Sequence, residues 1–301
     1  MKLSILGCYS ATPRIIAHTT SQVLETRGHL FLIDCGEGTQ VELRRHKIKF
    51  NQIKHIFISH LHGDHYFGLV GLISTFRLLT RETDLHIYGP KGLKEIITLQ
   101  LKLSESWTNF KLIFHVLSSK ESELVYEDEK VSVQTIPLDH RVYTNGFLFK
   151  EKPFERKLDI EKAEALNIDK AYFRKLKQGD DVTNEEGILI SNAEVTLEGH
   201  QPKSYAFCSD TAYKEDIVPI IKGVDVLYHE STFLDAHENL CVKTKHSTAK
   251  QAATIAMKAN VKQLILGHYS TRYGGLEGFK SEAETVFEKV LLADDGKVFN
   301  F

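Results

Sequence analysis

Short apolar runs recur along the chain, and most of them end in polar or glycine-containing turns, as buried β-strands do. They predict strands at residues 1–8, 30–34, 56–59, 86–90, 131–138, 204–209, 224–228 and 263–266. Apolar residues at helical spacing predict helices over 69–79, 92–103 and 248–259. This mixture, without an internal repeat, is typical of an α/β protein and argues against the repeat-array folds.

Polar side chains with ligand chemistry follow several of these strands. The strand at 56–59 leads into His60-Leu61-His62-Gly63-Asp64-His65, which holds four potential metal ligands. Alternate residues of an extended segment point the same way, so residues 60, 62 and 64 should share a face while the turn at Gly63 brings His65 around. Imidazole and carboxylate without thiolate suit zinc, with manganese or iron as alternatives. The motif therefore predicts a metal site.

This motif cannot complete the site, because zinc takes about four ligands and a catalytic site keeps one position for water. His140, Asp210 and His268 each follow a predicted strand, so we expect them to meet at one edge of a sheet and supply the missing ligands. A carboxylate among them could bridge two metals. Taken singly, Asp210 could instead be the N-cap of a helix over 212–217, and His268 a surface residue.

Composition narrows the class of protein. The 301 residues include 38 Lys+Arg, 40 Asp+Glu and 42% hydrophobic residues, which excludes a disordered or fibrous chain. The net charge of -2 gives no overall attraction to nucleic acid, so a polyanion would have to be held by local positive charge or by metal. The four cysteines form no C-x-x-C pair, and no apolar run reaches the roughly 18 residues of a membrane span. We therefore expect a cytoplasmic protein with reduced thiols and no membrane segment.

One segment differs from its surroundings in charge. Between residues 150 and 177, nine Lys and Arg stand against six Asp and Glu, a local net charge of +3, and core residues are few. Charge runs are most often solvated surface, which here would be an exposed helical hairpin. The alternative is an arm that presents Lys and Arg to phosphates.

The motifs resemble a known family. The 60–65 motif, followed by His140, Asp210 and His268 at increments of 75, 70 and 58 residues, is similar to the metallo-β-lactamase superfamily. Four further blocks narrow the resemblance to ribonuclease Z, the tRNA 3′-processing endonuclease, and extend it over nearly the whole chain. They are Asp34-Cys35-Gly36-Glu37-Gly38-Thr39-Gln40, His229-Glu230-Ser231-Thr232, His246-Ser247-Thr248 and Gly267-His268-Tyr269-Ser270-Thr271-Arg272-Tyr273.

The resemblance implies a four-layer αβ/βα sandwich with two zinc ions at the edge between its sheets. As in the family, one ion would be held by His60, His62 and His140, the other by Asp64, His65 and His268, and Asp210 would bridge them. A hydroxide between the metals would attack the phosphorus, with Asp64 orienting or deprotonating it. The implied products are a tRNA with a 3′-hydroxyl and a trailer with a 5′-phosphate.

The resemblance also implies a proton donor for the leaving 3′ oxygen. The family's proposed His–Glu pair maps to His246 and Glu230. A carboxylate bonded to imidazole raises the pKa of that imidazole and fixes its orientation, as a general acid near neutral pH requires. From the residues alone, His246 could instead cap the helix that opens at Thr248, and Glu230 could orient a metal ligand. His229 could be structural.

The charged segment falls where ribonuclease Z inserts its flexible arm. The resemblance thus implies a catalytic domain of residues 1–149 and 188–301, interrupted at 150–187 by a tRNA-binding arm that usually reaches across a homodimer. Residues 157–162 and 175–183 are similar to blocks of that arm. The chain departs from the family in lacking the Gly-Pro pair at the arm's tip, near residues 168–173, and the usual Arg placement in residues 13–18.

The leading hypothesis from the sequence is a zinc-dependent endoribonuclease that removes 3′ trailers from precursor tRNA. One alternative is a phosphodiesterase of the same fold that acts on small or cyclic nucleotides. Another, from a different class, is a metal-stabilised RNA-binding protein that does not cut. A β-lactamase is disfavoured because the sequence has no export signal.

Overall fold

The computed structural model describes residues 1–12, 14–15 and 17–301. They form two compact units, one of Met1–Lys150 with Lys203–Phe301 and one of Glu151–Pro202. We call the first the catalytic unit, after the domain that the resemblance implies, and the second the arm. The arm extends to Pro202, beyond the expected boundary at residue 187, because β13 (Thr196–Leu197) pairs with β10 (Lys157–Leu158).

The catalytic unit is built on two seven-stranded sheets. The first has the order β18 (Val298–Asn300), β1 (Lys2–Gly7), β2 (Ser21–Thr26), β3 (His29–Ile33), β4 (Ile53–Phe57), β5 (Leu85–Pro90), β6 (Leu112–Leu117). The second has the order β17 (Val290–Leu292), β16 (Leu264–Gly267), β15 (Val226–Glu230), β14 (Ser204–Cys208), β9 (Asn145–Glu151), β8 (Val131–Pro137), β7 (Leu124–Glu127). Strands β3 to β6 are parallel to one another, as are β14 to β17.

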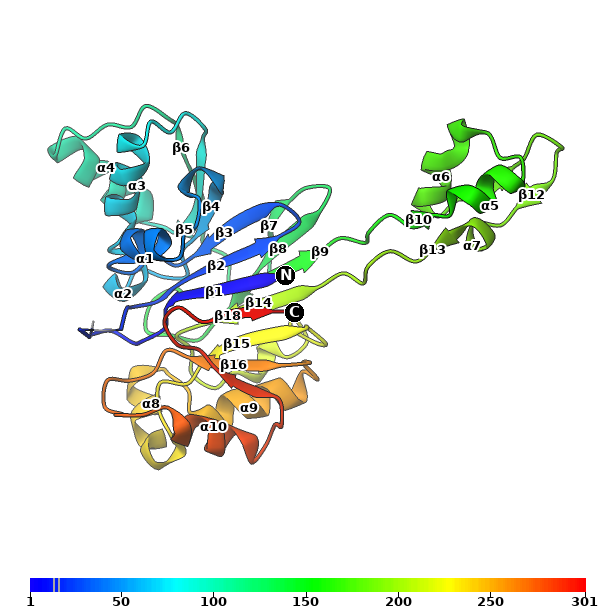
Figure 1. Cartoon of the computed structure of the whole chain (residues 1–301). Helices are drawn as coiled ribbons and strands as arrows, with labels where there is room; N and C mark the ends of the chain where they lie inside the picture. The colour runs from blue at the N-terminus through cyan, green and yellow to red at the C-terminus, as the bar shows by residue number, and fades with distance from the viewer. Residues whose placement is uncertain (13, 16) are drawn as a thin grey trace. The chain divides into compact units, whose positions relative to one another are not determined.

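Helices cover the outer face of each sheet (Figure 1). On the side of the first sheet lie α1 (Thr39–Arg45), α2 (Gly63–Tyr66), α3 (Leu69–Leu78) and α4 (Leu93–Leu103), with a 3₁₀ turn η1 at Phe50–Gln52. On the side of the second lie α8 (Glu238–Thr244), α9 (Ala249–Lys258) and α10 (Glu277–Glu284), with 3₁₀ turns η3 at Glu215–Ile217 and η4 at Asp235–His237. The expected four-layer αβ/βα sandwich is confirmed. None of the helices in the described residues is both long and apolar enough to cross a membrane.

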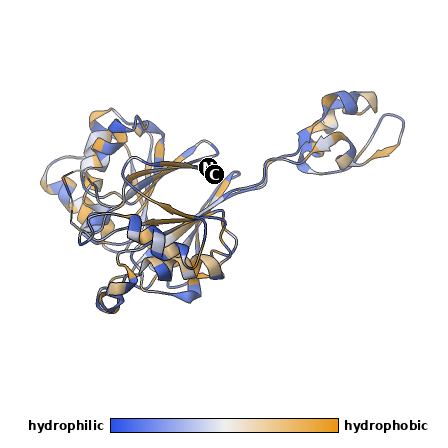
Figure 2. Ribbon diagram, turned by 60° about the horizontal axis from the view of Figure 1, so that its bottom comes forward, coloured by the Kyte–Doolittle hydropathy of each residue, from blue (hydrophilic) through white to orange (hydrophobic). Residues whose placement is uncertain are grey.

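Aromatic side chains fill the space between the two sheets. The ring centroids of Phe57 and Phe147 are 5.2 Å apart, and those of Phe31 and Phe149 are 5.4 Å apart, so each pair joins one sheet to the other. In Figure 2 the strands at the centre of the catalytic unit carry the hydrophobic colours, while the covering helices are mixed. Burial on both faces explains why the sequences of these strands are almost continuously apolar. Close packing also holds the polar residues at the strand ends in fixed positions.

Two local predictions differ from the structure in ways that matter for the site. The strand expected at 224–228 is β15, Val226–Glu230, so His229 and Glu230 are its last residues and do not follow it. No α-helix forms over 212–217; the 3₁₀ turn η3 begins only after Lys214. Asp210 is therefore not a helix N-cap.

The arm is a small folded unit with its own core. It contains α5 (Ile160–Ala165), η2 (Lys170–Tyr172), α6 (Phe173–Gln178), α7 (Asn192–Val195) and a pair of short strands, β11 (Val182–Thr183) and β12 (Leu189–Ile190), besides β10 and β13. Asp159 caps α5 by accepting a hydrogen bond from the Lys162 amide. The buried residues are Ala163, Ile168, Leu176, Val182, Ile190 and Val195. It is thus not the simple exposed hairpin that charge alone suggested.

Candidate metal centre

The 60–65 motif crosses from a loop into a helix. His60 and His62 lie in the loop after β4, and His62 is the N-cap residue of α2, which begins at Gly63. Asp64 and His65 therefore lie on the first helical turn, and the expectation that residue 64 continues an extended segment is wrong. Asp64 and His65 belong to a second candidate group, separate from that of His60 and His62, although the rings of His60 and His65 lie only 4.1 Å apart.

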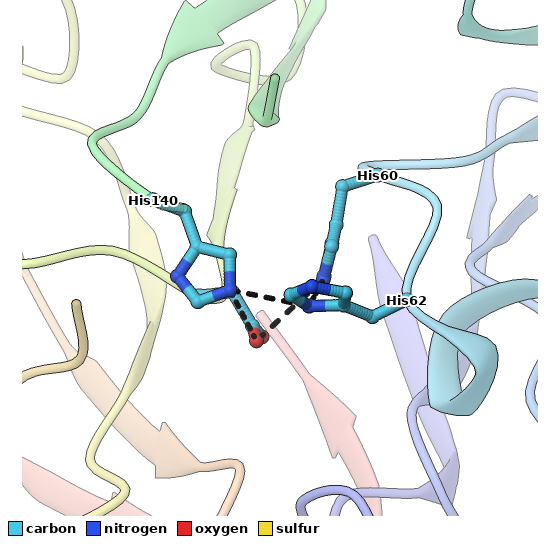
Figure 3. A group of neighbouring side chains, drawn as sticks. His60, His62 and His140 are labelled. Atoms are coloured by element: carbon cyan, nitrogen blue, oxygen red, sulfur yellow. Dashed lines mark hydrogen bonds and ion pairs between the residues drawn. The ribbon is translucent and has the colours of Figure 1, made fainter. Parts of the chain in front are cut away.

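The first group gathers three imidazoles around one carboxylate oxygen. Nε2 of His60 lies 2.9 Å from Nδ1 of His62, and Nε2 of His140 lies 3.2 Å from the same atom. Oδ2 of Asp210 lies 3.7 Å from Nε2 of both His60 and His140. Figure 3 shows the rings of His60 and His62, from one loop, turned toward the ring of His140 from another.

The second group uses the other oxygen of Asp210. Oδ1 lies 3.2 Å from Nε2 of His65 and 3.1 Å from Nε2 of His268. Oδ2 of Asp64 lies 3.4 Å and 3.6 Å from the same two nitrogens and accepts a hydrogen bond from the Ala11 amide at 2.9 Å. One carboxylate thus faces both groups, one oxygen to each, and the residues that follow β8, β14 and β16 meet as expected.

Both groups fit divalent cations. Nε2 of His65 and of His268 is buried and makes no hydrogen bond within the described structure, although each lies close to Asp210. Both nitrogens lie close to the same oxygen of Asp210, so they converge on one point as metal ligands do. Burial would lower the pKa of His65, yet Asp210, Asp64 and Asp34 raise it well above its usual value. The surrounding carboxylates therefore favour a positive charge at this position.

In the first group, the pKa values of the histidines are shifted downward. Burial lowers the pKa of His60, of His62 and of His140, which keeps these imidazoles neutral. A neutral imidazole can donate a lone pair to a metal, whereas an imidazolium cannot. Five histidines and two carboxylates, without thiolate, form a donor set suited to zinc or manganese.

Hydrogen bonds on the far side of the rings fix which nitrogen faces the site. Nδ1 of His65 bonds Oδ2 of Asp34 at 2.7 Å, and Nδ1 of His140 bonds the carbonyl of Lys245 at 2.8 Å. Nδ1 of His268 lies 3.0 Å from Oγ1 of Thr232, and Nδ1 of His60 lies 3.0 Å from Oγ of Ser59. Partners of this kind set the tautomer and orientation of a ligand. These partners were not expected from the sequence, although Asp34 and Thr232 lie in the blocks that carry the resemblance.

The block that begins at Asp34 packs directly against the ligand loop. The amide of Cys35 donates to the carbonyl of His65 at 2.8 Å, and the amide of Gly68 donates to the carbonyl of Cys35 at 2.9 Å. A Cβ on Gly68 would come within 2.1 Å of the carbonyl oxygen of Gly36. The glycine is therefore required for this close approach, which holds α2 in place with Asp64 and His65 on it.

Three site residues have left-handed backbone conformations. The φ angles are 56° at Asp34, 59° at Asp210 and 60° at His268. This region is unfavourable for residues other than glycine, and such strain persists where the surrounding structure holds it. Each residue follows a buried strand by one or two positions, so the sharp turn aims its side chain at the centre.

Glu230 connects a further histidine to the candidate ligands. Its Oε1 lies 2.8 Å from Nδ1 of His246 and accepts the Thr211 amide at 2.9 Å, while its Oε2 accepts Oγ1 of Thr232 at 2.6 Å. Burial disfavours a charge on His246, but Glu230 raises its pKa to about 9. Thr248 caps α9 itself, with Gln251 completing the capping box, so His246 is not the helix cap. His229 is buried and bonds the carbonyl of Glu230 through Nδ1 at 2.7 Å, outside both groups.

Residues 13–18, which lack the family's usual Arg placement, are partly described. Pro13 and Ile16 lie outside the described residues. The Arg14 guanidinium donates to the carbonyls of Ser270 and Tyr273, each at 3.2 Å. Arg14 therefore stabilises the loop that follows His268.

Comparison with known proteins places the chain in a family. Residues 1–173 match the family described as Anti-Pycsar protein Apyc1, and this part of the chain belongs to it. Ribonuclease Z of Bacteroides fragilis is 44% identical over 294 residues, covering 98% of this chain and 97% of that protein. Ribonuclease Z of Cytophaga hutchinsonii is 46% identical over 300 residues, covering 99% and 95%.

Solved structures agree in fold. Human tRNase Z, short form, has a TM-score of 0.74 and 28% identity, covering 100% of this chain and 99% of the human one. The metallo-β-lactamase fold protein YhfI from Bacillus subtilis has a TM-score of 0.69 at 18% identity, covers 99% and 98%, and shows the fold alone. Because the relatives named ribonuclease Z match almost from end to end, the chain belongs to the ribonuclease Z family of metal-dependent endoribonucleases.

Proposed function

We propose that this protein removes 3′ trailers from precursor tRNA with two zinc ions bound at the paired groups. The observation that carries the proposal is the bridging position of Asp210, whose two oxygens each lie within 3.7 Å of histidine nitrogens of a different group. The family membership supports an endoribonuclease, and the human relative is named for tRNA. A pure RNA-binding protein has no need for such an arrangement.

The proposed ligands are His60, His62 and His140 for one ion, Asp64, His65 and His268 for the other, with Asp210 between them. When bound, two such ions lower the pKa of water and neutralise charge that develops on the phosphoryl oxygens. Asp64 is held by the Ala11 amide, which leaves its carboxylate beside His65 and His268 to orient the nucleophile and accept its proton. Manganese is the alternative metal for this donor set.

We assign His246 as the proton donor to the leaving 3′ oxygen and Glu230 as the group that positions it. Nδ1 of His246 bonds Glu230, so Nε2 is the nitrogen left to deliver the proton. Hydrogen bonds from Thr211 and Thr232 hold the Glu230 carboxylate still. Cleavage then leaves a 3′-hydroxyl on the tRNA and a 5′-phosphate on the trailer.

Local positive charge supports RNA binding on both units. In the catalytic unit, a cavity of about 400 Å³ beside His140 is lined partly by Lys120, Arg141 and Lys214. In the arm, α6 buries Leu176 and exposes Arg174, Lys175 and Lys177. The arm as a whole contains eight Lys and Arg against twelve Asp and Glu. Its proposed grip on tRNA phosphates therefore rests on this basic face and not on net charge.

We further propose a homodimer in the cytoplasm. Large apolar side chains are exposed on the outer helix layer, with Leu78 at 79%, Leu103 at 76% and Trp107 at 55% exposure. Exposed apolar residues around the ends of two neighbouring helices are typical of an association surface. Sedimentation velocity on Leu103→Glu tests this: a dimer that becomes a monomer supports the proposal, and a monomeric wild type contradicts it. Four buried, unpaired cysteines suit a reducing compartment.

The central test compares two substrates. Zinc- or manganese-loaded protein should cut a trailer-bearing precursor tRNA, and Asp64→Ala should abolish cleavage while keeping much of the tRNA affinity. If only a chromogenic phosphodiester is hydrolysed, the protein is a small-substrate phosphodiesterase. If the wild type binds tRNA tightly and cuts neither substrate, it is a binding protein.

A further inference from the structure

A cavity beside His246 is not accounted for by metal binding or proton transfer. It has a volume of about 410 Å³ and is lined by Ala212, Tyr213, Glu238, Asn239, Cys241, Val242, His246 and Gln251. A phenol ring and aliphatic side chains with amide groups around them make a surface suited to a flat heterocycle. We propose that this cavity binds the base of the last nucleotide of the mature tRNA, the nucleotide whose 3′ oxygen leaves. The inference rests on the proposed function.

The position of His246 decides which nucleotide the cavity takes. Its Nδ1 is fixed on Glu230, and its ring forms part of the cavity wall. If Nε2 protonates the leaving 3′ oxygen, the ribose that carries this oxygen lies beside the same ring. The base of that ribose then enters the adjoining cavity. The trailer lies on the other side of the scissile phosphate.

The loop after β14 joins this cavity to the metal centre. Asp210 provides the carboxylate that faces both metal groups, and Tyr213 stands three residues further on in the cavity wall. The Ala212 amide donates to the carbonyl of Asp139 at 2.8 Å, which fixes the loop between the two. A base held against Tyr213 is therefore held in register with the reacting phosphate.

The Tyr213 ring is positioned before any substrate arrives. Its hydroxyl donates to Oε1 of Glu215 at 2.7 Å, and Nζ of Lys258 lies 6.0 Å from the ring centroid and pairs with Glu215. Fixed aromatic rings bind bases by stacking, and they tolerate any sequence because every base has a π-face. The cavity thus supplies alignment and affinity without selecting one base.

Substitution of Tyr213 and removal of the base should have coupled effects. Tyr213→Ala should lower kcat/KM for precursor tRNA by about 5- to 100-fold, the range for losing one stacked base, while Tyr213→Phe, which keeps the ring, restores most of it. With the wild type, removing the base of the last tRNA nucleotide should lower kcat/KM by a similar factor. With Tyr213→Ala, removing the same base should lower kcat/KM little further. An abasic first trailer nucleotide should show no such coupling. The proposal is overturned if the coupling appears at the trailer nucleotide instead, or if Tyr213→Ala cleaves as well as wild type.

A binding measurement separates this inference from the proposed function. Mature tRNA carrying 2-aminopurine as its last nucleotide should lose fluorescence on binding the wild type and Tyr213→Phe, because stacking quenches the base, and should keep it with Tyr213→Ala at saturation. An equal quench with all three proteins overturns the proposed contact. If the wild type quenches the base but leaves precursors uncut, the cavity assignment stands and the proposed cleavage fails.

Discussion

The Asp34 carboxylate and the His65 imidazole form a fully buried pair, with Oδ2 and Nδ1 2.7 Å apart. Asp34 also accepts hydrogen bonds from the amide and hydroxyl of Ser59, at 2.8 and 2.9 Å. Because of this hydrogen bond, Nδ1 of His65 faces the protein interior and Nε2 points toward Asp64 and Asp210. A residue behind the His65 ring thereby determines which nitrogen faces the two candidate groups.

Asp34→Asn should weaken metal binding at the second group by about 10- to 100-fold, because an amide does not hold His65 in the same tautomer. A competition titration against a chromogenic zinc chelator measures this change. Asp128→Asn is the matched control, since it alters another Asp–His pair, 2.8 Å from His29, away from the centre. Unchanged affinity in Asp34→Asn would contradict the proposed role of Asp34 in presenting His65 to the metal.

His246→Gln should reduce the rate of precursor cleavage by about 10²- to 10⁴-fold, the usual contribution of a general acid, while both metals stay bound. Glu230→Gln should lower the rate as well, because His246 loses the carboxylate that positions it. Metal content measured by mass spectrometry separates loss of proton transfer from loss of metal.

Replacement of the bridging 3′ oxygen by sulfur provides the sharper control. A thiolate leaves without needing a proton, so the sulfur-containing precursor should restore most of the rate in His246→Gln. An equally large defect on both substrates would mean that His246 acts in some other way.

Neutralising the basic face of α6 should weaken tRNA binding in a salt-dependent manner. Arg174→Ala, Lys175→Ala and Lys177→Ala should each reduce affinity and lower the slope of log K against log salt by about 1 if the residue contacts a phosphate. Glu185→Gln, an exposed acidic position in the same unit, is the control. A salt slope equal to that of wild type in all three variants would contradict a phosphate-binding arm.

The first sheet contains histidines that lie outside the metal centre. Rings of His55 and His86 stack with centroids 5.0 Å apart, and Nδ1 of His86 lies 3.0 Å from Nε2 of His115. Burial lowers the pKa of His55 to about 3. The groups that surround this ring are His29, Phe31, Lys54, His86, Tyr88, His115 and Tyr126.

This lowered pKa predicts acid destabilisation. The unfolded chain takes up the His55 proton near pH 6.5, and the folded chain takes it up only near pH 3. The contribution of neutral His55 to the free energy of unfolding is therefore complete above about pH 6.5. It decreases as the pH falls, by about 1–2 kcal/mol at pH 5. His55→Phe should reduce the difference in urea unfolding between pH 7.5 and pH 5, whereas exposed His200→Gln should not. An unchanged difference in His55→Phe would show that another group controls it.

The convergence of His140, Asp210 and His268 could be predicted because the apolar runs place them after strands, and buried strands hold those ends in place. The sharp backbone turns that aim these side chains could not be predicted. Nothing in the sequence distinguishes Asp210 with φ of 59° from a helix N-cap, since both follow a strand and precede polar residues. Which of the two conformations forms depends on contacts from other elements. One such contact is the hydrogen bond from the Ala212 amide to the carbonyl of Asp139.

The arm shows a second limit. The excess of positive charge lies in residues 150–177, but the core of the arm also includes Ile190 on β12 and Val195 at the end of α7, directly before β13 pairs with β10. Two-residue strands leave no readable periodicity. In the same way, Thr232 is hydrogen-bonded to both Glu230 and His268, which connects β15 to the end of β16. Only the folded sheet reveals this connection.

Cleavage of precursor tRNA in ¹⁸O-labelled water tests the central claim most directly. Attack by water on the phosphorus, with departure of the 3′ oxygen protonated by His246, predicts ¹⁸O in the 5′-phosphate of the trailer and an unlabelled 3′-hydroxyl on the tRNA. Mass spectrometry of the two fragments reads both ends at once. A 2′,3′-cyclic phosphate on the tRNA, or a trailer without label, would contradict the account.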